Sequence, residues 1–157
     1  MSDYIVTLQS DVELPHSVTA TWLRNVARRT LQHERQPYGL QVALLLTDDA
    51  TIARLNSQYR HVNGPTDVLA FASQGGEPFV LPDSARHHLG DVVVSLETAE
   101  RQAKEQGHPT AHELALLIVH GCLHLLGYDH ATSEEKARMW SLQADIVQDI
   151  LGDAHAP

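Results

Sequence analysis

Three histidines in the last third of the sequence have the spacing of metal ligands. His120, His124 and His130 lie at offsets zero, four and ten of the segment HGCLHLLGYDH, and Gly127 stands at offset seven. Zinc proteases with the pattern H-E-x-x-H-x-x-G-x-x-H carry their ligands and a glycine at the same offsets. The segment therefore predicts a metal site built from three imidazole groups.

Helix geometry supports the convergence of these side chains. At about 100° per residue, His120 and His124 project from one face of a helix, one turn apart. Gly127 can adopt a positive φ, so that the chain turns back and brings His130 to the same point. Three neutral imidazoles leave a fourth tetrahedral position open, as in catalytic zinc sites. We therefore predict one Zn²⁺ per chain.

A simpler interpretation is that these are core histidines with ordinary hydrogen-bond partners. Two of them, however, share a helix otherwise made of leucine, isoleucine and valine, where each unpaired polar group would cost about 1–3 kcal/mol. Cys122 lies about 200° around the helix from His120, which predicts an inert buried thiol rather than a ligand. Ligand number and spacing favour the metal site.

The residue after the first histidine is Gly121, where zinc proteases carry glutamate. That glutamate transfers a proton to the amine leaving group, so its absence weakens the prediction of a peptidase. Zinc would still lower the pKa of bound water and act as a Lewis acid. Phosphodiester cleavage mainly needs positive charge near the phosphoryl oxygens. The spacing thus leaves both classes of hydrolase open.

Composition sets wider limits on the protein. A chain of 157 residues with 43% hydrophobic and 20% charged residues fits one globular domain, residues 1–157. No apolar run approaches the ~20 residues of a membrane span, and MSDYIVTLQSD does not have the form of a signal peptide. The single cysteine fits a reducing cytoplasm. A net charge of −9 argues against a basic surface, so RNA contact would need a local patch.

Hydrophobic periodicity predicts strands that alternate with helices, in a mixed α/β packing. Strands are expected at Tyr4–Leu8, Leu40–Thr47, Thr66–Ala72 and Gly90–Ser95. Helices are expected from Ser17 to about Glu34, from Ser95 to Gly107, from Thr110 to Gly127 and from Thr132 to about Leu151. A short helix is also expected to start at Asp48 or Asp49, with Ile52, Leu55 and Tyr59 on its inner face. The helix that contains the histidines is apolar nearly all round and should be buried.

Capping signals mark the ends of these helices. Ser17 is expected to cap the first helix, and Thr110 with Glu113 is expected to form a capping box before the histidine helix. A second box, T-x-x-E from Thr132, opens the last helix. The expected buried side of that helix is an apolar stripe of Met139, Trp140, Ile146, Val147, Ile150 and Leu151. Gln143 interrupts this stripe, and its sequence context supplies no reason for a polar residue there.

The histidine segment resembles the signature H-G-x-L-H-L-x-G-Y-D-H of the YbeY family, bacterial endoribonucleases of ribosomal RNA maturation. Upstream, LNSQYRHVNGPTDVLAFA (55–72) resembles the family's L-N-x-x-Y-R…P-T-D-V-L-S-F-P segment, and LGDVVVS (89–95) is similar to its L-G-D-[IV]-x-[IV] strand. The closing helix with Met139 and Trp140 also fits. These motifs run in order through most of the chain.

The resemblance implies a zincin-like α+β fold with a small mixed four-stranded sheet, about five to six helices and a metal site on a buried helix of the C-terminal half. It implies zinc held by His120, His124 and His130, and a catalytic role for Arg60. The implied activity is a metal-dependent, single-strand-specific endoribonuclease that acts in the cytoplasm, at the 3′ end of 16S rRNA and in late ribosome quality control. Single-stranded RNA, the ribosome and ribosomal proteins are the implied partners.

Two segments depart from the family pattern. Ala70-Phe71-Ala72 replaces Ser-Phe-Pro, and His61-Val62-Asn63-Gly64 replaces the common G-K-D-K, which removes lysine charge from a loop expected to face RNA. Two other functions are alternatives: a zinc metalloprotease-like hydrolase, and a non-catalytic ribosome assembly factor stabilised by zinc. The general base stays unassigned. Asp129 could act as the base or could orient a neighbouring ligand. Asp67 and Asp91 fit a role in capping or turning the chain as well as a role in catalysis.

Overall fold

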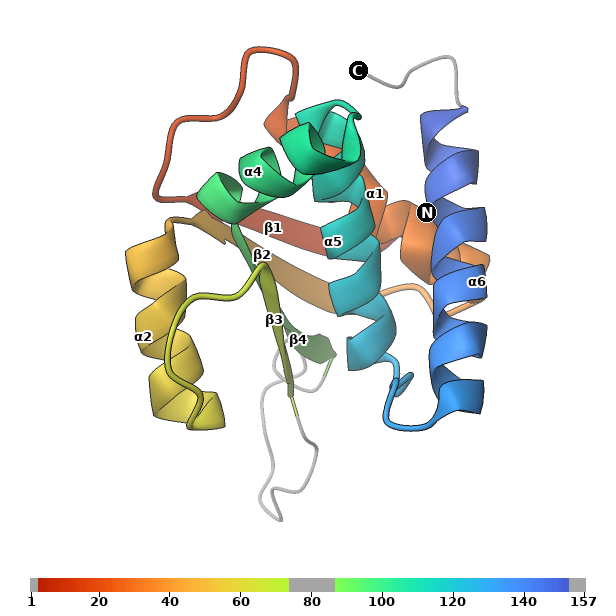
Figure 1. Ribbon diagram of the computed structural model, residues 1–157. Coiled ribbons are helices and arrows are strands. Elements are labelled where there is room, and N and C mark those ends of the chain that lie inside the picture. The colour runs from red at the N-terminus through yellow and green to blue at the C-terminus, as the bar shows by residue number, and fades with distance from the viewer. Residues whose placement is uncertain (1–2, 74–86, 153–157) are drawn as a thin grey trace.

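The computed structural model describes residues 3–73 and 87–152 (Figure 1). Within these ranges four strands and five helices follow one another. In chain order they are β1 (Ile5–Ser10), α1 (Ala20–His33), β2 (Gln41–Thr47), α2 (Asp49–Arg60), β3 (Val68–Ala72), β4 (His88–Ser95), α4 (Leu96–Gln106), α5 (Thr110–Leu125) and α6 (Ser133–Leu151). None of the described helices is both long and apolar enough to cross a membrane.

The strands form one mixed sheet in the order β1-β2-β4-β3. β1, β2 and β4 run parallel to one another, and β3 lies antiparallel to β4 at one edge. The expected α+β class with a small mixed sheet is therefore confirmed, and the number of described helices agrees with the expected five to six. The apolar run of β2 lies between β1 and β4, with Val42, Leu44 and Leu46 buried on one face and Ala43 and Leu45 half-buried on the other.

Helices cover the two faces of the sheet unequally. On one face Val42, Leu44 and Leu46 of β2 join the main core with α1, α5 and α6. On the other face a smaller cluster fills the space between α2 and the sheet; it consists of Ile52 from α2, Leu69 from β3 and Val93 from β4. α5 occupies the centre of the main core and contacts α1, α4, α6, β3 and β4, which agrees with its nearly uniform apolar sequence (Figure 1). This burial places the histidine segment on a rigid element.

The predicted start of the first helix was wrong by two residues. Thr19, not Ser17, is the N-cap, and its side chain accepts a hydrogen bond from the backbone N–H of Trp22 at 3.0 Å. The chain before it forms a turn, in which Val18 N–H donates to the Pro15 carbonyl. Ser17 belongs to this turn, so the second of two suitable hydroxyl side chains becomes the cap.

The capping box predicted at Thr110 was also wrong. Pro109 is the N-cap of α5, without a side-chain hydrogen bond, and Thr110 is the first helical residue. The Glu113 carboxylate lies 2.7 Å from Nε2 of His108 instead. A nearby imidazole thus competes successfully for the carboxylate that a capping box would need.

Other local predictions hold. Asp48 caps α2, Gly107 ends α4 in the left-handed conformation, and Thr132 forms the predicted capping box with Glu135. Tyr59 is an exception, because it is 58% exposed rather than turned inward. Its ring contacts the edge of Phe71 on β3.

Gly121 lies where α5 packs directly on the sheet. A Cβ atom at this position would stand 2.5 Å from Cγ1 of Val92 on β4 and 3.4 Å from Cγ2 of Val68 on β3. Val92 is fully buried, so it has little freedom to move aside. Glycine therefore permits the close approach of helix and sheet, and the position that holds glutamate in zinc proteases has no room here for a side chain.

Gly121→Ala is accordingly expected to lower the free energy of unfolding by about 1–3 kcal/mol, the usual cost of overpacking a core. Alanine normally stabilises a helix relative to glycine by about 1 kcal/mol, so the sign of the change is diagnostic. Urea denaturation measures it. In a Val92→Ala background the space is vacant, and Gly121→Ala should then be neutral or stabilising. A Gly121→Ala protein as stable as the parent would contradict the close approach.

Candidate metal centre

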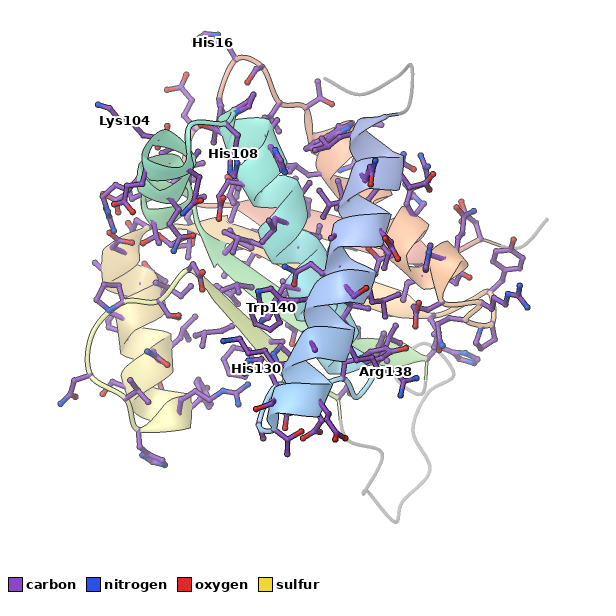
Figure 2. The ribbon with its side chains drawn as sticks, turned by 45° about the vertical axis from the view of Figure 1, so that its right-hand side comes forward. His16, Lys104, His108, His130, Arg138 and Trp140 are labelled. Atoms are coloured by element: carbon purple, nitrogen blue, oxygen red, sulfur yellow. The ribbon has the colours of Figure 1, made fainter. Side chains whose placement is uncertain are left out.

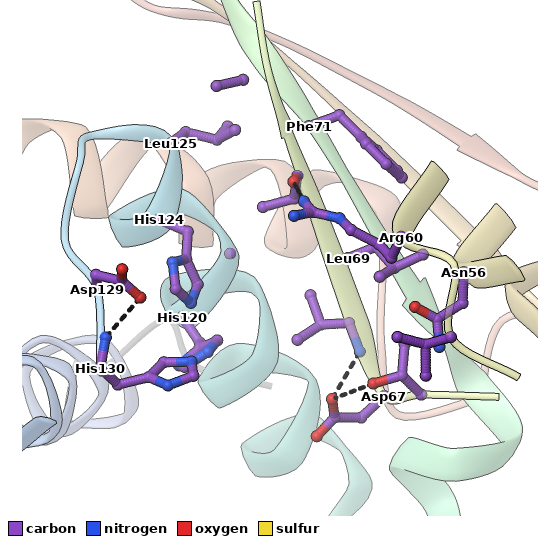
Figure 3. A pocket seen from close by; sticks show the side chains of 16 residues that line it. Asn56, Arg60, Asp67, Leu69, Phe71, His120, His124, Leu125, Asp129 and His130 are labelled. Atoms are coloured by element: carbon purple, nitrogen blue, oxygen red, sulfur yellow. Dashed lines mark hydrogen bonds between the residues drawn. The ribbon is translucent and has the colours of Figure 1, made fainter. Parts of the chain in front are cut away.

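The structure brings the three predicted histidines together at the C-terminal end of α5 (Figure 3). One ligand nitrogen from each of His120, His124 and His130 lies within 4.8 Å of the other two, so the group could hold a metal ion. The ring centroids are 4.7 Å apart for His120 and His124, and 5.0 Å apart for His124 and His130. α5 supplies the first two histidines from successive turns, and the following loop supplies the third.

The loop after α5 is held in place by several local contacts. Gly127 has a φ of 102°, as the turn required. The Tyr128 hydroxyl donates to Oε1 of Glu34, just beyond α1, at 2.6 Å. Oδ1 of Asp129 accepts a hydrogen bond from the backbone N–H of His130 at 2.7 Å. These contacts tie the position of His130 to the main core.

The electrostatics of the cluster favour neutral imidazoles at His120 and His124. Burial lowers the pKa of His120, the neighbouring His130 lowers it further, and the bond to Gln143 partly opposes both. Burial also lowers the pKa of His124, with further lowering by His120 and His130. Neutral imidazole is the form that binds metal ions. Proximity and protonation state therefore both fit a metal centre.

α6 supplies two side chains that sequence reasoning did not place at the site. Oε1 of Gln143 lies 2.8 Å from Nδ1 of His120. The Trp140 ring was expected on the buried side of α6 but is 41% exposed, and it lies beside His130 (Figure 2). It stands edge-on to His120 and His130 at centroid distances of 5.4 and 5.5 Å. The polarity of Gln143 within an apolar stripe was the available signal, but its partner lies 23 residues away in the chain.

A cavity of about 870 Å³ opens beside the histidines. Its first wall carries the three histidines and Asp129, and its second wall carries β3 with Asn56, Arg60 and Asp67 (Figure 3). Asn56 is buried, and its side-chain amide donates to the carbonyl of Gly64, which holds the loop after α2. The cavity thus joins the histidine cluster to the segments that resemble the family upstream.

Arg60 lies at the end of α2, on the wall opposite the histidines. Its Nη2 donates to the carbonyl oxygen of Ala70, and its Cζ lies 5.3 Å from the centroid of the Phe71 ring. His61, with a φ of 58°, ends the helix directly after it. A guanidinium has five N–H donors, so one bond to the strand leaves others for a ligand. The Ala70 carbonyl and the Phe71 ring therefore hold Arg60 on the cavity wall.

Of the two remaining aspartates and the cysteine, only one aspartate lies at the cavity of the histidines. Asp67 lines the cavity, and its Oδ1 accepts from the backbone N–H of Val68 at 2.8 Å. Asp91 pairs with Nε2 of His88 at 3.1 Å and lines a different cavity. Cys122 is fully buried, and burial raises the pKa of its thiol to about 12, as expected for an inert core residue.

Comparisons with known proteins all point to one family. The sequence model of the family described as Endoribonuclease YbeY matches residues 4–151. A protein named Endoribonuclease YbeY from Heliobacterium modesticaldum is 40% identical over 94% of this chain and 95% of its own length. One of the same name from Pelotomaculum thermopropionicum is 44% identical over 91% and 93%. The solution structure of TM1509 from Thermotoga maritima is similar with a TM-score of 0.62 and 25% identity, covering 94% of this chain and 90% of that one.

Proposed function

Since the chain belongs to the YbeY family of endoribonucleases, we propose that it is a zinc-dependent endoribonuclease specific for single-stranded RNA. The proposal extends to one zinc ion per chain, bound by His120, His124 and His130, in a single domain that covers residues 1–157. The observation that carries it is the cavity with these histidines on one wall and a held arginine on the other.

Each wall has a distinct chemical task. A zinc ion at the histidines would act as a Lewis acid and would make water a stronger nucleophile near neutral pH. Arg60 can donate two parallel hydrogen bonds to phosphoryl oxygens, and the charge on these oxygens must be stabilised in the transition state. Ala70 and Phe71 orient the guanidinium in advance, so less conformational entropy is lost when RNA binds. Arg60 also provides the local positive charge that a chain of net charge −9 needs to contact RNA.

The edge of β3 speaks against a peptidase. Zinc-site peptidases would need to hold an extended chain, and an exposed strand edge can do this by adding a strand. The Asp67 carbonyl accepts from Ser95 N–H of β4, so in this antiparallel pair Val68 and Ala70 direct their backbone groups toward the free edge. Asp67 already accepts the N–H of Val68, and Arg60 already donates to the Ala70 carbonyl. Two groups that a peptide strand would use are thus engaged within the chain.

Single-stranded RNA should be cleaved in a chelator-sensitive reaction, whereas casein and single-stranded DNA of the same sequence should stay intact. Gly121→Glu should not create an efficient peptidase, because Val92 leaves no room for a side chain at this position and the strand edge would be unchanged. Gel analysis of the three substrates, with His124→Ala as the background control, measures this. Casein cleavage that disappears in His124→Ala would indicate a metalloprotease, and zinc binding without any cleavage would indicate an assembly factor.

In the cell, we place this activity in the cytoplasm, at the 3′ end of 16S rRNA and in late ribosome quality control, with the ribosome and ribosomal proteins as partners. The family membership supports this assignment. Sequencing of rRNA 3′ ends after depletion of the protein tests it. Accumulation of 16S rRNA with unprocessed 3′ ends is expected, and unchanged ends would contradict it.

A further inference from the structure

Gln143 is a polar residue in an apolar environment. It is 5% exposed and shares the inner side of α6 with Met139, Ile146 and Ile150, all of which are buried in the main core. Its Oε1 lies 2.8 Å from Nδ1 of His120 on α5. A leucine would suit the packing of α6 at least as well, so the glutamine serves the contact with the histidine.

This contact determines which nitrogen of His120 faces the cavity with a free lone pair. An amide oxygen can only accept, so Nδ1 must carry the proton. In a neutral imidazole the proton on Nδ1 leaves the lone pair on Nε2, on the other side of the ring, available to a metal. His120 is thus held as the Nδ1–H tautomer before any ion arrives.

Trp140 supports the same arrangement from the preceding turn of α6. Its ring stands edge-on to both His120 and His130, and the Lys136 ammonium lies 5.4 Å from its ring centroid. The tryptophan limits rotation of the His120 ring about its Cβ–Cγ bond. The hydrogen bond to Gln143 then selects the orientation of that ring. α6 therefore contacts two of the three histidines without supplying a ligand.

We infer that Gln143 is a positioning residue for the metal centre, which sets the tautomer and orientation of His120 so that Nε2 faces the ion. The inference rests on the proposed metal-binding function. Hydrogen-bond partners of metal-bound histidines typically change metal affinity by about 10–100-fold when they are removed.

The test is a set of three variants on one helix. Gln143→Leu removes the acceptor and keeps the volume, Gln143→Glu keeps an oxygen acceptor, and Gln148→Leu makes the same change at an exposed site on α6. Zinc dissociation constants come from competition with a chromophoric chelator. Gln143→Leu should weaken binding by about 10–100-fold, and Gln143→Glu and Gln148→Leu should each stay close to the parent. Parental affinity in Gln143→Leu would overturn the inference.

The tautomer of His120 gives a second readout that needs no metal. Long-range ¹H–¹⁵N NMR spectra of the metal-free parent should show the Nδ1–H form, and Gln143→Leu should lose this preference. An Nε2–H form in the parent would overturn the positioning role. If the parent shows the Nδ1–H tautomer but does not bind zinc, the proposed metal centre fails while the role of Gln143 in orienting His120 stands.

Discussion

His124→Ala is expected to abolish stoichiometric zinc binding and RNA cleavage together. His124 provides one of three clustered nitrogens, and the two that would remain belong to different segments, α5 and the loop after it. Metal analysis of the purified parent should find about one zinc per chain, and the variant should retain little of it. Loss of the ion should also lower the melting temperature, since a ligand present at 100 times its Kd stabilises the folded state by about 2.7 kcal/mol.

A matched control for this prediction lies on the same helix. His112 is half-buried on α5 and stacks on His108 at a centroid distance of 4.1 Å, apart from the three clustered histidines. His112→Ala should therefore keep its zinc and its chelator-sensitive activity. Full zinc occupancy in any two of the variants His120→Ala, His124→Ala and His130→Ala would refute the assignment of the site.

Arg60→Ala is expected to retain the fold and the zinc but to lose RNA cleavage by about 10³-fold, the lower range for removal of an arginine that stabilises a transferring phosphoryl group. Arg60→Lys should lose at least about 100-fold. Lysine offers a single point charge and cannot bridge two phosphoryl oxygens, so the charge alone should not restore the rate. Single-turnover cleavage of a defined single-stranded RNA, at saturating protein, separates this effect from weaker RNA binding.

Arg54 provides the control for charge on the same helix. Its Nη2 donates to Thr51 on the surface of α2, and it does not line the cavity of the histidines. Arg54→Ala should therefore cleave RNA at nearly the parental rate. The alternative role for Arg60 is stabilisation of the C-terminal end of α2, worth about 0.3–1 kcal/mol. Parental cleavage by Arg60→Ala, with only a lower melting temperature, would establish that structural role instead.

Features that depend on neighbouring residues could be predicted from the sequence. The histidine cluster is of this kind, because a spacing of four within a helix and a glycine turn bring the three imidazoles near one another through local geometry. The caps at Asp48 and Thr132 were predicted for the same reason. The errors arose where two local solutions compete, as at Ser17, or where another side chain takes the carboxylate, as at Glu113.

Only the tertiary structure decided what surrounds the histidines. Val92 on β4 explains why residue 121 must be glycine, and His120 on α5 explains why residue 143 is polar. The Ala70 carbonyl on β3 explains where the Arg60 side chain lies. The pattern of apolar residues predicts which side of an element is buried, but it does not say which element lies against that side. The sequence by itself therefore determined the residue types of the candidate metal centre and their convergence. The packing of α5, α6 and β3 decided the tautomer of His120, the exclusion of a side chain at Gly121 and the cation on the opposite wall, because each depends on contacts between residues distant in the chain.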